Sequence, residues 1–107
     1  MTSQLSSGNL ISDRYASALY DLASENKVVD LVLKNLKSIK DLINENKELQ
    51  LLVRSPLIAT NDKLEILLKI MGEQNLNVLS ITFLKVISKN KRFASLLSII
   101  SQFDNIN

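Results

Sequence analysis

Apolar residues recur at spacings of three and four along most of this chain, and that period constrains the fold more than any other feature. The stretch from residue 28 to residue 44 shows it most regularly, through Val28, Leu31, Val32, Leu36, Ile39, Leu42 and Ile43. Such a period places the side chains on one face of an α-helix, whereas a β-strand requires strict alternation. Only two glycines and one proline stand among the 107 residues, and turn-rich β folds use many more. The sequence therefore predicts an all-α protein.

Start and stop signals divide this pattern into six helices. Pro56 ends one of them, because the residue before a proline is pushed out of the helical region, and Gly72 is a typical residue just beyond a helix. Candidate N-caps are Ser12, Thr60 or Asn61, and Asn77. The Asn-Lys pairs at 26–27, 46–47 and 90–91 fall at junctions, where asparagine tolerates the left-handed backbone. The predicted helices span about 12–26, 28–44, 47–54, 60–72, 77–89 and 92–103.

Helices of this length, joined by short connections, favour a compact six-helix bundle. A chain of 107 residues is near the commonest domain size and can build one core of its own. Residues 1–11 are rich in Ser, Gln, Gly and Asn, so we expect a flexible N-terminal tail there. Residues 12–107 are expected to form the helical domain.

The residue types needed for most catalytic chemistry are missing. The chain has no histidine and no cysteine, which excludes Ser-His and Cys-His nucleophiles and the commonest ligands of transition metals. Its two glycines, Gly8 and Gly72, stand alone and form no phosphate-binding loop. The carboxylates fall mostly on polar helix faces or at helix ends. We therefore expect no catalytic residues, no metal site and no cofactor, and the chain is predicted not to be an enzyme.

Charge leaves two interpretations of one basic cluster. The formal net charge is +2 and the sequence pI is about 9.0, which is far from the dense positive stripe of a dedicated nucleic-acid binder. Lys85, Lys89, Lys91 and Arg92 gather around the predicted end of the fifth helix. These cations could bind phosphate groups, or they could complement the negative end of a helix dipole. We favour the second interpretation because no aromatic residues for base stacking are interleaved with them.

Two predicted helices have wider apolar faces than a surface helix needs. On a helical wheel the apolar residues of 13–25 sweep roughly 200° and those of 77–90 roughly 220°, against about 100° for an ordinary surface helix. Ala18 and Leu22 lie at the edge of the first arc, whereas Leu19, Ala23 and Ile87 lie deeper and are expected in the core. One interpretation is a groove between the two helices that accepts a partner's amphipathic helix. The alternative is that the bundle's own helices cover both arcs, since the fourth predicted helix also has a wide arc.

Four stretches resemble one family in order and spacing. They are "RYASALYDLA" at 14–23, "SPLIATNDKLEIL" at 55–67, "FLKVISKNKRFASL" at 83–96 and "IISQF" at 99–103. Together they resemble the δ subunit of bacterial F-type ATP synthase and its mitochondrial counterpart, the oligomycin-sensitivity-conferring protein. Each stretch is degenerate alone, but the four cover almost the whole predicted helical region in register.

The resemblance implies a non-catalytic stator component of the ATP synthase. In that family a six-helix N-terminal domain sits atop the catalytic head and binds the N-terminal helix of an α subunit between its first and fifth helices. A peripheral position at the cytoplasmic face of the bacterial inner membrane is implied, with no nucleic acid bound and no direct insertion into the membrane. By the family motifs, Tyr15 and Ala18 should line one wall of this groove, and Phe83, Val86 and Asn90 the other. The wheel adds Leu22, at the edge of the first arc beside Ala18, and it places Val86 at an edge of the arc of the fifth helix.

Length is where the chain departs from the family. Family members carry a second, smaller domain that joins the b-subunit stalk, and the sequence ends at Asn107, about where the first domain should end. We therefore expect a truncated form in which the C-terminal domain is absent, and attachment to the b subunit falls to that domain. Two alternatives stay open: a helical RNA- or DNA-binding module that uses the cluster from Lys85 to Arg92, and a generic helical adaptor for another peptide.

Overall fold

Six α-helices and two short 3-10 turns make up the regular structure of residues 7–106, the part of the chain that this computed structural model describes. No strand occurs among those residues, and the predicted all-α class is confirmed. The elements in chain order are α1 (Ser7–Glu25), α2 (Val29–Asn44), α3 (Lys47–Arg54), α4 (Thr60–Met71), η2 (Glu73–Asn75), α5 (Val78–Lys89), η3 (Phe93–Ser95) and α6 (Leu96–Ile106).

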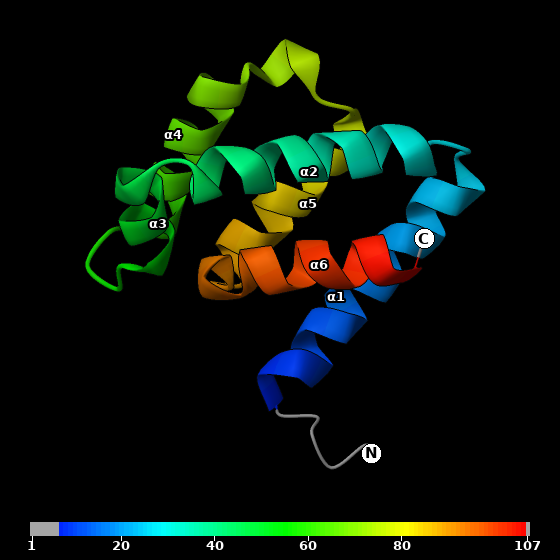
Figure 1. Ribbon diagram of the computed structural model, residues 1–107, viewed down its shortest axis with the longest axis horizontal. Helices are drawn as coiled ribbons and strands as arrows, with labels where there is room; N and C mark the ends of the chain where they lie inside the picture. Colours follow the sequence, from blue (N-terminus) through cyan, green and yellow to red (C-terminus); the bar gives the residue numbers. More distant parts are fainter. Residues whose placement is uncertain (1–6, 107) are drawn as a thin grey trace.

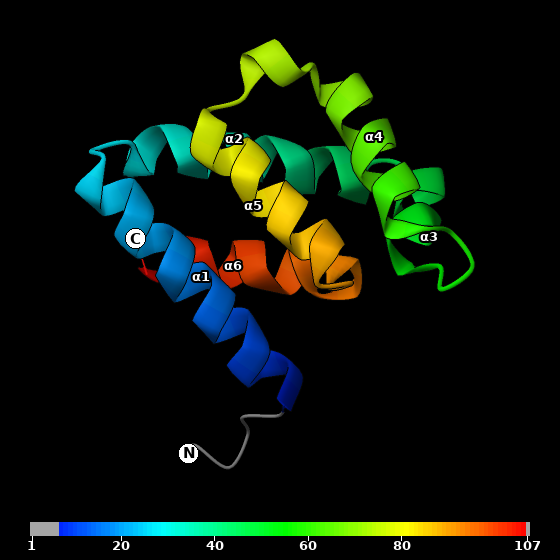
Figure 2. The ribbon, with the colours of Figure 1, turned by 180° about the vertical axis from the view of Figure 1, so that it is seen from behind.

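The helices pack in two crossed layers. Figure 1 shows α2 and α6 on the near face, with α3 and α4 gathered at one side. Figure 2, the view from behind, shows α1 and α5 side by side on the opposite face, and these two helices contact each other. The most extensive contact in the bundle joins α1 to α6 across the two layers. Helices α1 and α5 are therefore held from one side by α2 and α6.

The core lies between these layers and is almost entirely aliphatic. Leu19, Ala23 and Ile87, which the helical wheel placed deep in the two wide arcs, are buried as expected. Tyr20 of α1 and Phe103 of α6 stack in a tilted arrangement with ring centroids 5.4 Å apart. The largest side chains that are completely enclosed include Phe93, Phe103, Leu36, Ile39, Ile43 and Leu67.

Helix α1 begins earlier than the sequence predicts. It starts at Ser7, so Ser12 is not its N-cap but an interior residue whose side chain is almost completely buried. Ile11, one turn before Tyr15, is half-buried, and its packing favours helical structure beyond the capping signal at Ser12. Residues 1–6 of the expected tail lie outside the described residues, and residues 7–11 belong to the helix.

Most of the other boundary signals hold. Asn46 caps α3 by accepting hydrogen bonds from the backbone N–H groups of Glu48 and Leu49, and Asn77 caps α5 by accepting from Leu79. Gly72 follows α4 with a φ of 82°, as the prediction of a helix end there requires. The N-cap of α4 differs: Ala59, rather than Thr60 or Asn61, takes that position, and no side chain caps the helix.

The left-handed residues at two helix ends are lysines, not the asparagines expected from the Asn-Lys pairs. Lys27 and Lys91 have φ values of 59° and 58°. After α1, the N–H of Val28 bonds to the carbonyl of Ala23 and that of Lys27 to Ser24, and the same pattern follows α5. This is the Schellman arrangement, in which the residue just beyond the helix turns left-handed. The asparagine stands one position too early to take that role.

A buried amide fixes the start of α5 against α2. The Oδ1 atom of Asn35 accepts a hydrogen bond of 2.8 Å from the backbone N–H of Asn77 and one of 2.9 Å from the hydroxyl of Ser80. Asn35 lies in the middle of α2 and is buried; its bond to Ser80 is buried, and its bond to Asn77 is partly buried. Breaking them would leave the buried Oδ1 atom and the Ser80 hydroxyl unpaired, which is costly, and these bonds therefore help to set the orientation of α5.

In the part of the chain that the structure describes, no helix is both long enough and apolar enough to cross a lipid bilayer.

Candidate protein-binding surface

The outward flanks of α1 and α5 stay exposed although both helices belong to the core. Leu22 on α1 keeps 48% of its surface exposed, Val86 on α5 keeps 39%, and Val78 at the start of α5 keeps 68%. Ala18 is also exposed. Helices α1 and α5 lie side by side on one face of the bundle (Figure 2), and they contact each other. We call the outward flanks of α1 from Ile11 to Leu22 and of α5 from Val78 to Asn90 the α1–α5 surface.

A hydrogen bond ties the two helices together at one end of this surface. The side-chain amide of Asn90, the C-cap of α5, donates to the hydroxyl of Tyr15 at 2.7 Å. Tyr15 is half-buried and packs against the core, whereas Asn90 is exposed. The C-terminal end of α5 thus lies beside the N-terminal half of α1, so the two helices run in opposite directions. Two residues predicted for opposite walls of the groove are in direct contact.

A shallow pocket of about 380 Å³ opens at the same end of the surface. Its lining is Ile11, Arg14, Tyr15, Ala18 and Arg92. The apolar part of this lining can take a hydrophobic side chain, and the two arginines at its margin can pair with acidic groups. Tyr15 and Ala18, two of the residues predicted for the groove, both line this pocket, and no residue of α5 does.

The six residues predicted for the groove differ in their solvent exposure. Ala18, Leu22, Val86 and Asn90 are exposed and Tyr15 is half-buried, so these side chains are available to a partner. Phe83 is only 5% exposed and belongs to the core cluster. Its position on α5 therefore supports the surface from beneath.

Sequence reasoning missed three residues of the pocket. Ile11 was assigned to the tail, and Arg14 and Arg92 were not assigned to the groove. The spacing of positions 11, 15, 18 and 22 continues the apolar stripe of α1 by one turn and would have found Ile11. Arg92 carried no such signal, because its placement depends on the turn that follows α5.

The basic cluster at the end of α5 is solvent-exposed. Lys85, Lys89, Lys91 and Arg92 all have exposed side chains. The ion pair recorded among residues 10–106 joins Lys37 to Asp104 instead, at 3.8 Å. Phe93, the aromatic residue that follows the cluster, is 2% exposed and offers no face to a nucleic-acid base. The cluster therefore has charge without a stacking platform.

Comparison with known proteins links this fold to one family. The family model described as ATP synthase delta (OSCP) subunit matches residues 11–107. A protein named ATP synthase subunit delta from Rhizobium leguminosarum bv. trifolii (strain WSM2304) is 35% identical over 102 residues, which is 95% of this chain and 53% of the relative. Its namesake from Phenylobacterium zucineum (strain HLK1) is 37% identical over 94 residues, 88% of this chain and 51% of the relative. The chain thus spans about half the length of the curated relatives that it matches.

Proposed function

Because this chain belongs to the ATP synthase delta (OSCP) subunit family, we propose that its bundle is a non-catalytic joint in the stator of an F-type ATP synthase. The joint forms when the N-terminal helix of an α subunit binds along the α1–α5 surface. The observation that carries this proposal is the pair of exposed apolar flanks on two neighbouring helices, in a chain of this family. Amphipathic helices commonly bind in grooves of this kind.

The role is mechanical. Rotation of the central shaft exerts a torque on the catalytic head, and a stator must keep the head from turning with the shaft. A helix seated between α1 and α5 is held from below by the core, because Phe83 and Leu19 are buried beneath the two flanks. The joint therefore transmits load into a packed interior, which deforms little.

Exposed aliphatic side chains supply the apolar contact for this attachment. Complete burial of a fully exposed Val or Leu side chain contributes about 1.5–3 kcal/mol. Leu22, Val78 and Val86 are 48%, 68% and 39% exposed, so each can contribute only the corresponding part of that gain. Binding surfaces typically depend on a few anchors worth about 2 kcal/mol or more each. Ordering of the partner segment on binding costs free energy and offsets part of this gain. We therefore expect the attachment to need all three aliphatic anchors, together with a close approach of the partner helix at Ala18.

The remaining family roles extend this proposal beyond the described bundle. By the family resemblance, attachment to the b-subunit stalk would fall to a second, C-terminal domain, and this chain spans only about half the length of the curated relatives. Within the complex the bundle would lie peripherally, at the cytoplasmic face of the bacterial inner membrane.

The decisive experiment is calorimetric titration with a synthetic peptide of the α-subunit N-terminal helix. Wild-type protein should bind the peptide, and Ala18→Asp should bind it at least about tenfold more weakly, because a docked partner would remove the new carboxylate from water, a cost that Arg14 and Arg92 of the same pocket offset only in part. Ala18 is exposed in the free protein, so circular dichroism melting should show an unchanged fold. An unchanged affinity in Ala18→Asp, or no binding by the wild type, would contradict the proposal.

Ser38→Asp is the matched control. It adds the same charge to an exposed position on α2, in the layer opposite the α1–α5 surface. Its affinity for the peptide should equal that of the wild type. A loss of binding in this variant as well would mean that net charge, and not the surface, governs the interaction.

A further inference from the structure

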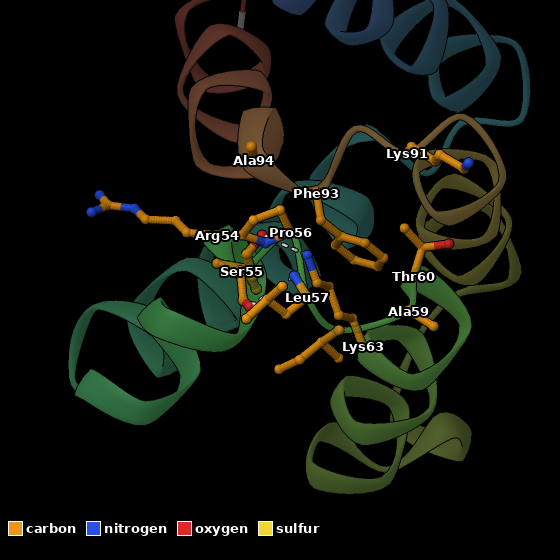
Figure 3. Close-up of a pocket in the computed structure, with 12 residues that line it drawn as sticks. Arg54, Ser55, Pro56, Leu57, Ala59, Thr60, Lys63, Lys91, Phe93 and Ala94 are labelled. Atoms are coloured by element: carbon orange, nitrogen blue, oxygen red, sulfur yellow. Dashed lines mark hydrogen bonds between the residues drawn. The ribbon is translucent and has the colours of Figure 1, made fainter.

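A second pocket lies away from the α1–α5 surface, where the stretch that leads from α3 into α4 meets the segment after α5. Its volume is about 630 Å³, and it is bounded by the α3–α4 loop, the first turn of α4 and the segment after α5. Figure 3 shows Lys63 of α4 at its centre, beside the ring of Phe93 and beneath the loop that carries Pro56 and Leu57. The family roles argued above make no use of this pocket.

Lys63 is the one charged side chain that is buried within residues 10–106. It is 5% exposed, and its ammonium donates a hydrogen bond of 3.2 Å to the backbone carbonyl of Val53 near the end of α3. The ammonium lies 6.0 Å from the centre of the Phe93 ring. These two contacts hold the charge in one place. An ammonium has three donors, and the carbonyl of Val53 engages one of them.

The lining of the pocket supplies no formal negative charge, although the Val53 carbonyl that the ammonium engages lies at the negative, C-terminal end of the α3 dipole. No carboxylate is among the described residues that line the pocket, and Asp62, in the same turn of α4, is exposed and outside the lining. Burial therefore lowers the pKa of Lys63 from its ordinary value of 10.5. A charge in this position is stabilised by any anion that enters the cavity.

Other features of the pocket also favour a negatively charged ligand. Arg54 and Lys91 line it, and Figure 3 shows their side chains extending outward on opposite sides. Both chains are long enough to turn toward a bound anion. Helix α4 also begins in the wall at Ala59 and Thr60 without a side-chain cap, so the positive end of its dipole adds to the potential.

We propose that this pocket binds an oxyanionic group, a phosphate or a carboxylate, through the ammonium of Lys63. The group accepts a charge-assisted hydrogen bond from Lys63, and Arg54 and Lys91 close over it from the rim. The site is separate from the α1–α5 surface, although the turn Asn90–Arg92 contributes to both: Lys91 lines this pocket and Arg92 lines the other.

Two-dimensional NMR titration of the 107-residue chain tests this directly. Sodium phosphate and sodium acetate are added in separate series at constant ionic strength, with sodium chloride as the reference salt. At least one oxyanion should shift the amide signals of residues 54–63 and 91–94 saturably, and the comparison identifies which oxyanion is preferred. No saturable shift with either, or equal shifts around every exposed lysine, would overturn the proposal.

Two variants distinguish anion binding in this pocket from non-specific attraction of anions to the positive charges of the protein. Lys63→Met keeps the length of the buried stem and removes the ammonium, and it should bind the preferred anion about tenfold more weakly or not at all. Lys69→Met removes an exposed charge from the same helix and should bind like the wild type. Equal binding by Lys63→Met and the wild type would overturn the proposal.

A second measurement needs no variant and covers the case in which Lys63→Met fails to fold. The pKa of Lys63 is followed by side-chain ¹⁵N NMR in the wild-type protein, with and without the anion. The pKa should rise when the anion is bound, because a nearby negative charge favours the protonated amine. An unchanged pKa at saturating anion would overturn the proposal.

Discussion

Lys27 and Lys91 take the left-handed positions that end the two helices of the α1–α5 surface. A side chain with a Cβ atom is strained there by about 1–2 kcal/mol, and glycine is the usual residue for this position. Lysine offers partial compensation, because its positive charge lies next to the negative end of the helix dipole. Both turns therefore hold the backbone in a conformation that their own residue disfavours.

Replacing Lys27 with glycine should stabilise the protein. Lys27→Gly relieves the strain but adds flexibility to the unfolded chain, which leaves a net gain of about 0.5–1 kcal/mol in the free energy of unfolding. The gain is measured as a higher Tm by circular dichroism. Lys34→Gly is the control, since Lys34 is exposed inside α2 and glycine there should cost about 1 kcal/mol. A lower Tm for Lys27→Gly would show that the charge of Lys27 matters more than the strain.

At the scale of the element, helix α1 carries alanine both on its buried face and on its exposed face. Ala16 and Ala23 are completely buried among the helices that α1 contacts, whereas Ala18 faces outward on the α1–α5 surface. The small side chains of the inner face let α6 approach α1 closely. The same residue type on the outer face leaves room for a partner.

Enlarging these alanines should have opposite consequences. Ala16→Leu forces three further carbons into a filled interior and should lower the free energy of unfolding by about 1–3 kcal/mol. Ala18→Leu should change it by no more than about 0.5 kcal/mol, because that side chain points to solvent. Urea unfolding monitored by circular dichroism measures both. A strongly destabilised Ala18→Leu would mean that the outer face of α1 is covered.

Periodicity predicted these faces from the sequence because the helical repeat alone determines them. Leu19, Ala23 and Ile87 were expected inside and Leu22 and Val86 at the edge, and the structure places them so. The start of α1 was predicted five residues late, because a serine before an apolar run resembles a helix cap in the sequence, whereas the folded bundle buries Ser12 inside the helix. The pocket around Lys63 was not predicted, since two stretches distant in sequence, within residues 53–63 and 91–94, form it.

At the scale of the whole molecule, the weak net charge gives a way to distinguish a peptide partner from a nucleic-acid partner. A formal net charge of +2 gives little long-range attraction, and the α1–α5 surface is mainly aliphatic between its arginines. Binding of the α-subunit peptide should therefore change less than about threefold between about 50 and 200 mM NaCl. A nucleic-acid binder with several phosphate contacts would lose about a thousandfold or more over that range.

Titration at the two salt concentrations, alongside fluorescence anisotropy with a single-stranded RNA, measures this difference. The RNA should not bind at the higher concentration. Steep salt dependence for the peptide, or firm RNA binding, would favour the cluster at Lys85, Lys89, Lys91 and Arg92 as the functional site.

The hydrogen bond between Asn90 and Tyr15 joins residues that are 75 positions apart. A ribosome making this chain completes α1 long before it makes α5, so a nascent chain carries one side of the α1–α5 surface without the other. Under the proposed function, docking of the α-subunit helix would wait until synthesis has passed Asn90. An assembly intermediate that holds only the first four helices would leave the aliphatic side chains of α1 open to the wrong neighbours.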